Sequence, residues 1–554
     1  MKHWIFVSIL FVTNLSQAAA FTVINTNDSG AGSLRSAIIG VNTNGGAQLI
    51  DFAIPPFDGT VKTITPLTTL PVINRSVTID GYTQDPAHSH PNTQVTSDDA
   101  VLLIQLTGTL AGGDGLGLAA SNCVVRGLVV NGWAVNGISI SFVSGGGATN
   151  RNCVVEGCFI GTDPTGMIKH GNGQGILAAE PNLLVGGDTL AARNLVSGNN
   201  SVGVNTGGGS VTNVLIEGNF IGIDSSGTNG LGNGSTGVTI TTATKNSVIG
   251  NVIGGNGAAG VSVNTAGNIV QGNAIGTDIT ATLNLSNHTA GVALTSASDN
   301  TIGGDSAGNF IAFNGGAGVS VSSGVPNRTN NLISANGIFS NGALGIDLDA
   351  LGVTSNDTCS VGAGANRLQN FPVITSVSSV GISMTIAGFL HSVPNTLYTL
   401  EFFINNVCDP SGFGEGEQFI GSTNVLTGAN CSNVFTVILP VGAADGLLIT
   451  ATATDPNHNT SEFSRCVPIA SPAPFRITAI TRTGNDIRVT WTMSPGKTNA
   501  LQRTAGGPNG SYSTNNFAPI FTITNTVGTV TNYLDVGAVS GTSTSRYYRV
   551  RQAP

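Results

Sequence analysis

Two aspartates near residue 350 are best suited, by type and spacing, to do chemistry. Asp347 and Asp349 flank Leu348, so in a β-strand both carboxylates point to one face while Ile346 and Leu348 point to the other. Paired carboxylates can act as general acid and base on glycosidic bonds. They also keep the outer face of a strand solvated, and no His, Arg or Lys lies beside them. We therefore expect a solvated strand, and the sequence assigns no catalytic, cofactor-binding or metal-ligating residue.

A second polar segment offers oxygen atoms in the arrangement that a cation could use. Within Asp455-Pro-Asn-His-Asn-Thr-Ser-Glu462, the side chains of Asp455, Asn457, Asn459 and Glu462 carry the oxygen ligands that Ca²⁺ prefers. A tight turn between two strands is built from the same residue types. Both interpretations stay open: no cofactor is predicted, and structural calcium is the alternative.

Three aspartates recur after an Ile-Gly-x phrase, at Asp163, Asp224 and Asp278. Stacked carboxylates would repel one another unless a cation or a sugar surface compensated them. An aspartate that closes a turn with its own backbone explains the same pattern. We favour the turn.

The remaining chemical patterns are weak. Gly255-Asn-Gly-Ala-Ala-Gly260 has the letters of a dinucleotide-binding loop, but that loop requires a following helix, and a strand pattern follows here. Basic residues are scattered through the middle of the chain, and the adjacent pair Lys169-His170 is expected in an exposed loop.

A repeated phrase must position these residues. A Gly followed by Val or Ile recurs at intervals of 23 to 38 residues, with Asn-led phrases in between. The phrase begins at Gly137, Gly175, Gly203, Gly237, Gly260, Gly291, Gly318 and Gly345. A period of this length with strand-type alternation predicts a solenoid whose coils bury their apolar faces against one another. Cys123 and Cys153 occupy equivalent positions in successive repeats and are interpreted as buried small residues.

Composition narrows the class of partner. The 554 residues include 77 Gly, only 9% are charged, and the net charge is −9. Tight corners and a stacked core account for the Gly content. We see no basic cluster, which argues against nucleic acid and anionic membranes. An extracellular glycan or a surface protein is the expected partner.

The N-terminus predicts export. Residues 1–20 combine a basic start, an apolar run from Trp4 to Val12 and Ala18-Ala-Ala20, as in a secretory signal peptide. No later segment is long and apolar enough to suggest a membrane span. Four cysteines in the C-terminal half predict two disulfides, with all three pairings open. These are Cys359, Cys408, Cys431 and Cys466.

Several phrases together resemble a known family. The opening FTVINTNDSGAGSLRSAI, the phrase LPVINRSVTIDGYTQ and the repeats CFIGTDPTG, GNFIGID and GNAIGTD are similar to bacterial extracellular right-handed parallel β-helix proteins with a Ser-Leu-Arg-x-Ala-Ile N-terminal cap. The resemblance implies that fold, and the sterics of crossover connections favour the same hand. Ser33 is the expected helix N-cap, and the loop Thr83–Asp99 is expected to protrude. The pectin-cleaving hydrolases of this fold carry Asp-Asp, Gly-His-Gly and Arg-Ile-Lys phrases, of which only Asp98-Asp99 is present.

The repeat ends after Leu348, and two further modules follow. The phrase ITATATDPNHNTSEFSRC resembles an immunoglobulin-like module, and the strands around Trp491 and Tyr548 resemble a fibronectin type III module. The predicted fold is therefore all-β, a right-handed parallel β-helix followed by two β-sandwiches. The expected parts are a signal peptide (1–20), cap and first coils (21–118), regular coils (119–350), a linker (351–367), an immunoglobulin-like sandwich (368–470) and a fibronectin-like sandwich (471–554).

The sequence predicts a secreted or cell-surface protein without enzymatic activity, whose shaft and modules serve adhesion or contact with matrix and glycans. Two alternatives remain, a polysaccharide-active lyase or glycoside hydrolase and a non-catalytic carbohydrate-binding scaffold. Convergent carboxylates and a base on one face would indicate the enzyme, whereas a flat surface of Asn, Thr and Ser would indicate the binding protein.

Overall fold

The computed structural model describes residues 19–552 with short internal gaps. The gaps are 45–47, 142–151, 209–210, 305, 323–327, 350, 360–361, 445, 470–475, 494–497, 508, 525–529 and 541–544. Of the predicted signal peptide, residues 1–18 lie outside the described part, and Ala19 and Ala20 begin the first strand. None of the helices in the described ranges is long and apolar enough to cross a membrane.

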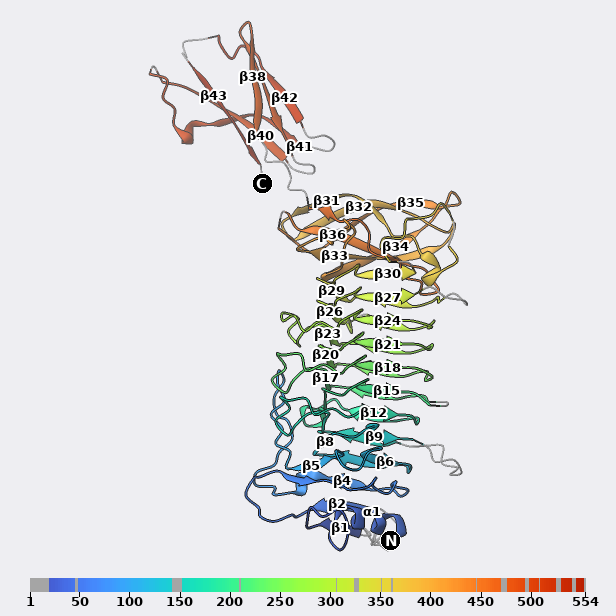
Figure 1. The fold of residues 1–554 in the computed structure, drawn as a ribbon. Helices are drawn as coiled ribbons and strands as arrows, with labels where there is room; N and C mark the ends of the chain where they lie inside the picture. The colour runs from blue at the N-terminus through green and yellow to red at the C-terminus, as the bar shows by residue number, and fades with distance from the viewer. Residues whose placement is uncertain are drawn as a thin grey trace, which may run out of the picture. The chain divides into compact units, whose positions relative to one another are not determined.

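Three parallel sheets of 11, 10 and 9 strands build the first part of the chain, and each regular coil contributes one strand to each sheet (Figure 1). Sheet A contains, in spatial order, β1 (Ala19–Val23), β2 (Gln48–Phe52), β4 (Thr78–Asp80), β7 (Val124–Arg126), β10 (Val154–Glu156), β13 (Leu184–Gly186), β16 (Leu215–Glu217), β19 (Ser247–Ile249), β22 (Ile269–Gln271), β25 (Thr301–Gly303) and β28 (Leu332–Ser334). Sheet B contains β3 (Lys62–Ile64), β5 (Ile104–Thr107), β8 (Leu128–Asn131), β11 (Phe159–Ile160), β14 (Leu195–Val196), β17 (Phe220–Ile221), β20 (Val252–Ile253), β23 (Ala274–Ile275), β26 (Phe310–Ala312) and β29 (Gly337–Phe339). Sheet C contains β6 (Leu116–Leu118), β9 (Asn136–Ile140), β12 (Gln174–Ala178), β15 (Val204–Thr206), β18 (Val238–Ile240), β21 (Val261–Val263), β24 (Val292–Leu294), β27 (Val319–Ser322) and β30 (Ile346–Asp349). The predicted parallel β-helix is confirmed.

The repeated Gly-Val/Ile phrase starts the strands of sheet C, as predicted. Its Val or Ile points into the core, and the preceding Gly allows successive coils to approach closely. At Gly203, for example, an added Cβ would lie 2.6 Å from the carbonyl oxygen of Gly237 in the next coil. Any larger residue would therefore force two coils apart.

A ladder of buried asparagines runs along each of the three corners of the coils. In each ladder the side-chain amide of one Asn donates to the Oδ1 of the Asn in the next coil, at 2.8 to 3.2 Å. The exception is Asn331, whose backbone N–H donates to Oδ1 of Asn366 at 3.1 Å. The ladder between sheets A and B consists of Asn194, Asn219, Asn251, Asn273, Asn309 and Asn336. The ladder between sheets B and C consists of Asn172, Asn199, Asn233, Asn256, Asn287, Asn314 and Asn341. The ladder between sheets C and A consists of Asn246, Asn268, Asn300, Asn331 and Asn366. The corners thus satisfy buried polar groups that no strand pairing reaches.

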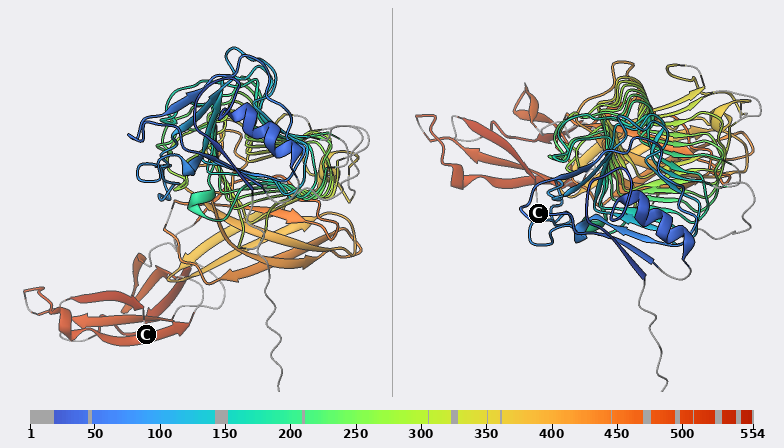
Figure 2. Two further views of the ribbon diagram at one scale, coloured as in Figure 1. Left: turned by 90° about the horizontal axis from the view of Figure 1, so that it is seen from below. Right: turned by 60° about the horizontal axis from the view of Figure 1, so that its bottom comes forward.

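The first coil is closed by a helix. Helix α1 (Leu34–Thr43) lies across the coils in the view from below (Figure 2). Ser33 caps it, because its Oγ accepts the backbone N–H of Ser36 at 3.2 Å, as predicted. The buried face of α1, which includes Ile38 and Val41, joins the same core as Val23 and Ile50. The short 3₁₀ turns η1 (Gly81–Thr83) and η2 (Leu190–Ala192) lie in corner loops.

Antiparallel sheets follow the β-helix along the chain. The chain passes through η3 (Ala365–Leu368) into a three-stranded sheet, ordered β31 (Val373–Val380), β32 (Ser383–His391) and β35 (Ser432–Leu439). A four-stranded sheet is ordered β34 (Gln418–Leu426), β33 (Leu397–Asn405), β36 (Leu448–Thr454) and β37 (Val467–Pro468). Two disulfides, Cys359–Cys431 and Cys408–Cys466, confirm the predicted number and fix the pairing. Cys123 and Cys153 are buried in the core, as predicted.

Two three-stranded sheets form the C-terminal module. One is ordered β38 (Ile477–Thr483), β39 (Asp486–Thr492) and β42 (Val530–Asp535); the other is ordered β41 (Ala518–Thr524), β40 (Thr498–Ala505) and β43 (Arg546–Gln552), with η4 (Thr514–Asn516) before β41. Trp491 is fully buried in this module, as predicted. The chain divides into two compact units. The first comprises 1–375, 387–435 and 448–467, and the second comprises 376–386, 436–447 and 468–554.

We expect Asn251→Ala to lower the free energy of unfolding by about 1–3 kcal/mol, since it leaves buried partners unsatisfied. Oδ1 of Asn251 accepts both the N–H and the side-chain amide of Asn219 at 2.9 Å, and its own amide donates to Asn273 at 3.0 Å. Urea denaturation followed by circular dichroism measures the change. The control Asn205→Ala, on the outer face of sheet C, should cost less than about 0.5 kcal/mol; equal costs would contradict a structural role for the ladder.

Candidate functional site

Asp347 and Asp349, the aspartate pair of the last coil, lie in strand β30. Ile346 and Leu348 point into the core, as predicted. Asp349 accepts the backbone N–H of Ala365 at 2.9 Å, which holds the segment after the coil. Asp347 is 5% exposed, and burial raises its pKa because the charged form is disfavoured. Its Oδ1 has no hydrogen-bond partner among the residues that the structure describes. The expected solvated face is therefore covered at Asp347.

The recurring aspartates close turns, as we favoured. Asp163 accepts the N–H groups of Met167 and Ile168 at 3.1 and 3.0 Å. Asp224 accepts the Asn229 side chain at 2.9 Å. Asp278 accepts the N–H groups of Thr282 and Leu283, and its pKa is lowered to about 2, with hydrogen bonds outweighing its burial. Each carboxylate thus has a local structural role.

The candidate calcium ligands separate into two groups. Asp455 accepts the N–H of Asn457 and both the N–H and the side chain of Asn459, at 2.8 to 2.9 Å, which is a closed turn. Glu462 instead accepts the N–H groups of Leu348 and Thr354 at 3.0 and 2.8 Å. Across the described ranges there is no group of three or more His, Cys, Asp or Glu that could hold a metal ion. The turn interpretation of Asp455 is confirmed.

The loop Thr83–Asp99 lies on the shaft, so the prediction that it protrudes is wrong. The Arg193 guanidinium donates to the carbonyls of Gln94 and Ser97 at 3.0 and 2.7 Å and stacks on Phe220 at 4.1 Å. These contacts hold the loop over the outer side of sheet B. Burial raises the pKa of Asp98 in this loop to about 6.

Two other motifs have structural explanations. The segment Gly255–Gly260 runs directly into strand β21, as expected, so a helix N-terminus for pyrophosphate is missing from it. Lys169 is exposed and donates to the carbonyl of Gly232 at 2.8 Å, in agreement with the predicted surface loop.

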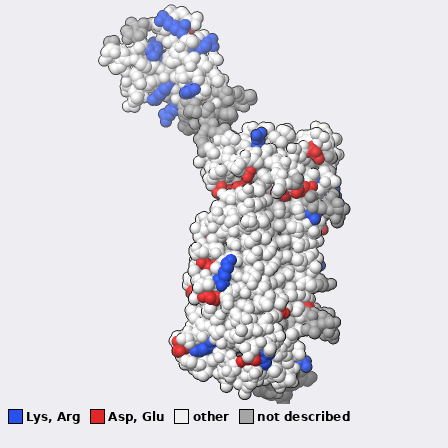
Figure 3. Space-filling view, viewed as in Figure 1, with Lys and Arg blue, Asp and Glu red and all other residues white. Residues whose placement is uncertain are grey.

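The outer face of sheet C is an almost uncharged surface. One row of outward positions is in register from coil to coil, and it contains Ser139, Leu177, Asn205, Thr239, Ser262, Ala293, Ser320 and Asp347. Hydroxyl and amide groups dominate it, and the single carboxylate lies in the last coil. In the space-filling view, charged side chains are sparse over much of the visible shaft (Figure 3).

Three glutamates of the antiparallel region accept hydrogen bonds at the end of the β-helix, one at the last strand of each parallel sheet. Glu401 accepts the Ser334 hydroxyl at 2.5 Å and the Ala335 N–H at 3.0 Å, next to β28. Glu415 accepts the N–H groups of Ser340 and Asn341 at 2.6 and 2.9 Å, just after β29.

The third glutamate, Glu462, accepts the N–H of Leu348 within β30. Asn366 ends the third asparagine ladder, and its amide donates to Asn331 and Thr460. At the last strand of all three parallel sheets, acceptors from the antiparallel region therefore take the place of water.

Burial perturbs two of these carboxyls. Glu415 and Glu462 are 7% and 3% exposed, and loss of water raises the pKa of both, that of Glu462 to about 7. The backbone donors oppose this shift, but desolvation outweighs them. Glu462 is therefore a proton-binding group near neutral pH.

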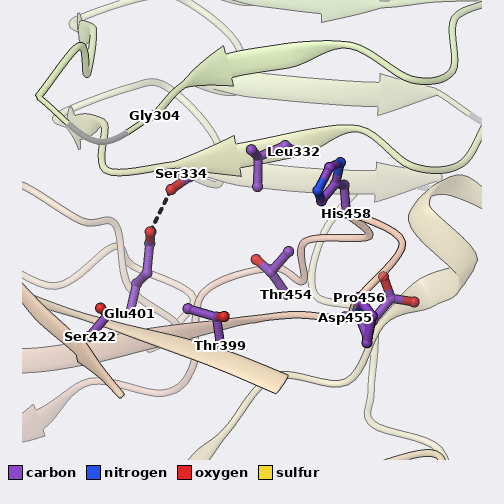
Figure 4. Close-up of a pocket in the computed structure, with 10 residues that line it drawn as sticks. All are labelled: Gly304, Leu332, Ser334, Thr399, Glu401, Ser422, Thr454, Asp455, Pro456 and His458. Atoms are coloured by element: carbon purple, nitrogen blue, oxygen red, sulfur yellow. Dashed lines mark hydrogen bonds between the residues drawn. The ribbon is translucent and has the colours of Figure 1, made fainter. Parts of the chain in front are cut away.

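A cavity of about 370 Å³ lies where the last coils meet the four-stranded sheet (Figure 4). Gly304, Leu332 and Ser334 come from the coils, and Thr399, Glu401, Ser422, Thr454, Asp455, Pro456 and His458 come from the sheet and its turn. Glu401 and Asp455 are already occupied by the hydrogen bonds above. The remaining groups are hydroxyls, an imidazole and the apolar side chains of Leu332 and Pro456, which can bind a small polar molecule without supplying an acid–base pair.

Comparisons with known proteins gave similar solved structures but no family. Neither a scan against protein-family models nor a search of curated proteins gave a match. Among solved structures, the A-module of the Azotobacter vinelandii mannuronan C-5 epimerase AlgE4 is 15% identical, with a TM-score of 0.36 over 59% of this chain and 80% of that chain. The periplasmic alginate epimerase AlgG is 14% identical, with a TM-score of 0.30 over 54% and 73%. A mutant tailspike of Escherichia coli bacteriophage HK620, solved with a pentasaccharide, is 12% identical, with a TM-score of 0.27 over 81% and 94%. At these identities the similarity concerns the fold alone.

Sequence reasoning missed the asparagine ladders and the three capping glutamates. The ladders left a signal, because an Asn recurs at each corner just before a strand. The glutamates left none, since their partners are backbone groups 66 to 114 residues away.

We expect Glu462→Gln to flatten the dependence of stability on pH. The folded protein binds the proton of Glu462 more tightly than the unfolded chain, whose carboxyl has its ordinary pKa near 4.3. In the wild type this group therefore favours folding below about pH 4.5, and its contribution is lost as the pH rises to about 7, by up to about 1 kcal/mol per unit. Urea denaturation at pH 5, 6 and 7 measures the slope.

Glu417→Gln is the matched control, because Glu417 accepts the N–H and side chain of Asn406 and makes no such contact with the last coil. It should retain the wild-type slope. An unchanged slope in Glu462→Gln would contradict the assignment.

Proposed function

We propose that this protein is an exported, non-enzymatic surface or secreted protein whose β-helix holds a glycan or matrix polymer along sheet C. The observation that carries the proposal is the outer row of sheet C, where Ser, Asn or Thr occupies five of the eight coils and three of these are consecutive. Strand spacing places these groups about 4.8 Å apart in a straight line. Such a row can exchange hydrogen bonds with the successive hydroxyls of an extended chain.

The use of the carboxylates supports a binding protein over an enzyme. Asp163, Asp224 and Asp278 close turns, and Glu401 and Glu415 hold the end of the helix. A glycosidase needs two carboxylates that are free to face one bond. These five are occupied by hydrogen bonds to the protein.

The extracellular setting and the module types belong to the same proposal. Two disulfides indicate an extracytoplasmic compartment. We retain the right-handed sense of the helix, the immunoglobulin-like assignment of 368–470 and the fibronectin type III-like assignment of 471–554. Modules of these kinds commonly space or bind, which suits a surface protein.

A polysaccharide-active enzyme is the second candidate, and Asp347 favours it. This carboxyl lies in the outer row of sheet C, has a raised pKa, and has one oxygen without a partner in the described structure. A buried carboxyl of this kind can act as a general acid. Product formation that depends on Asp347 would support this candidate.

The test is a glycan-array screen of the mature protein, followed by reducing-end and unsaturated-product assays on each bound polysaccharide. We expect binding without product, and we expect Thr239→Lys/Ser262→Lys to weaken it at least tenfold by blocking the row. The control Ser247→Lys/Thr301→Lys makes the same change on the outer face of sheet A and should leave binding unchanged. Equal losses, or no binding, would contradict the proposal; product lost in Asp347→Asn would favour the enzyme.

A further inference from the structure

The charge of the chain is divided unevenly. Eight of its twenty Lys and Arg residues lie after residue 470, but only two of its twenty-nine Asp and Glu residues do. Residues 471–554 therefore carry +6, while residues 1–470 carry −15. The expectation that the chain has no basic cluster is wrong for this segment, where Lys and Arg are spread over the visible surface (Figure 3). Such asymmetry indicates an anionic partner.

Both acids of the segment are engaged within it. Asp535 binds Arg503 at 2.6 Å and accepts the Tyr548 hydroxyl at 2.7 Å. Asp486 accepts the N–H of Gly537 at 2.7 Å. In the part of the segment that the structure describes, Arg503 is the arginine whose charge is paired with a carboxylate.

Alternation along β43 places two of these arginines on one face. Tyr548 and Val550 pack against the core around Trp491 and Leu501. Neighbours in a strand point to opposite sides, so Tyr547, Arg549 and Arg551 face away from that core. On this face Tyr547 and Arg549 are half-buried and Arg551 is exposed.

Aromatic rings surround the arginines. The Tyr512 ring lies 4.4 Å from that of Tyr547 and 5.7 Å from that of Phe517. The Arg549 guanidinium lies 4.4 Å from the Phe517 ring and is held by the Gln502 side chain at 2.7 Å. Tyr512 is 51% exposed. We call Tyr512, Phe517, Tyr547, Arg549 and Arg551 the aromatic–arginine patch.

We propose that the aromatic–arginine patch binds an acidic polysaccharide. Exposed aromatic faces offer apolar surface to the C–H side of a sugar ring, and their polar tips remain in water. The exposed Arg551 guanidinium can match a carboxylate in a two-point hydrogen bond. Arg549, whose Nε and Nη1 donate to Gln502 and to the Thr514 carbonyl, adds a fixed positive charge beside it. Seven of the eight basic residues in the segment are Arg. A polymer of uronic acids presents both features in every residue. Single-stranded nucleic acid shares the chemistry, but the extracytoplasmic compartment favours the polysaccharide.

This site is separate from the row on sheet C and does not depend on the proposed function of the shaft. The probe is fluorescently labelled polygalacturonate, with neutral dextran as the uncharged comparison, titrated into the full mature chain at 50 mM and 200 mM salt. We expect binding of polygalacturonate only, weaker at the higher salt. Arg549→Gln/Arg551→Gln should raise Kd at least tenfold and flatten the salt dependence.

The matched control is Arg482→Gln/Arg488→Gln, which removes the same charge from the other sheet of the module and should raise Kd less than threefold. Tyr512→Ala should raise Kd severalfold without changing the salt dependence. Unchanged fluorescence of the buried Trp491 verifies the fold of each variant. Thr239→Lys/Ser262→Lys should bind polygalacturonate as the wild type does, which separates this site from the shaft.

Three results would overturn the proposal. Absence of polygalacturonate binding by the wild type would remove the site. Equal losses in the two double variants would assign binding to overall charge instead of the patch. Tighter binding of a labelled oligo-dT than of polygalacturonate would assign the patch to single-stranded nucleic acid.

Discussion

At the end of a stack of parallel coils, the backbone groups of the last strands have no further strand to pair with. The rest of this structure follows from how these groups are satisfied. Within the stack, each strand pairs with the next, and the asparagine ladders do the same for the corners. At the last coil there is no further strand to accept the N–H groups. Glu401, Glu415 and Glu462 supply those acceptors, so the antiparallel region completes the hydrogen bonding of the helix.

This use of carboxylates explains why the chain has few acidic residues to spare for chemistry. In the shaft, aspartates close turns where the corners are wide, and at its end glutamates replace a missing strand. Burial makes the end caps costly, as the raised pKa of Glu462 shows. Neutral side chains take the outer positions of sheet C, and positive charge is concentrated in the C-terminal module. The structural roles of the carboxylates and the neutral outer face of sheet C are thus carried by different residue types.

Local periodicity made the fold predictable, because each Gly-Val/Ile phrase forms the same strand and Ser33 caps its helix through residues nearby. Turn-closing by Asp163 and Asp455 is equally local, so it was visible in the sequence. The contacts of Glu401 with the end of the β-helix join segments that are far apart in the sequence, and so do the contacts of Arg193 with the loop Thr83–Asp99. Residue spacing alone does not reveal such contacts. The number of arginines in the last strand is visible in the sequence. That they share one face follows only from the structure, in which Tyr548 and Val550 pack into the core.

The glutamates that cap the β-helix come from a later part of the chain, and this affects the order in which the polypeptide folds. Ladder and strand contacts join neighbouring coils, so the shaft can form progressively as the chain is synthesised, from its N-terminal helix onward. The final coil has to wait until the chain as far as Glu462 has emerged, more than a hundred residues later. Cys408 lies within that interval and Cys466 follows shortly after Glu462, in the chain segment that ends it, so this disulfide also forms late. Completion of the last coil and pairing of Cys408 with Cys466 therefore await the same segment of the chain.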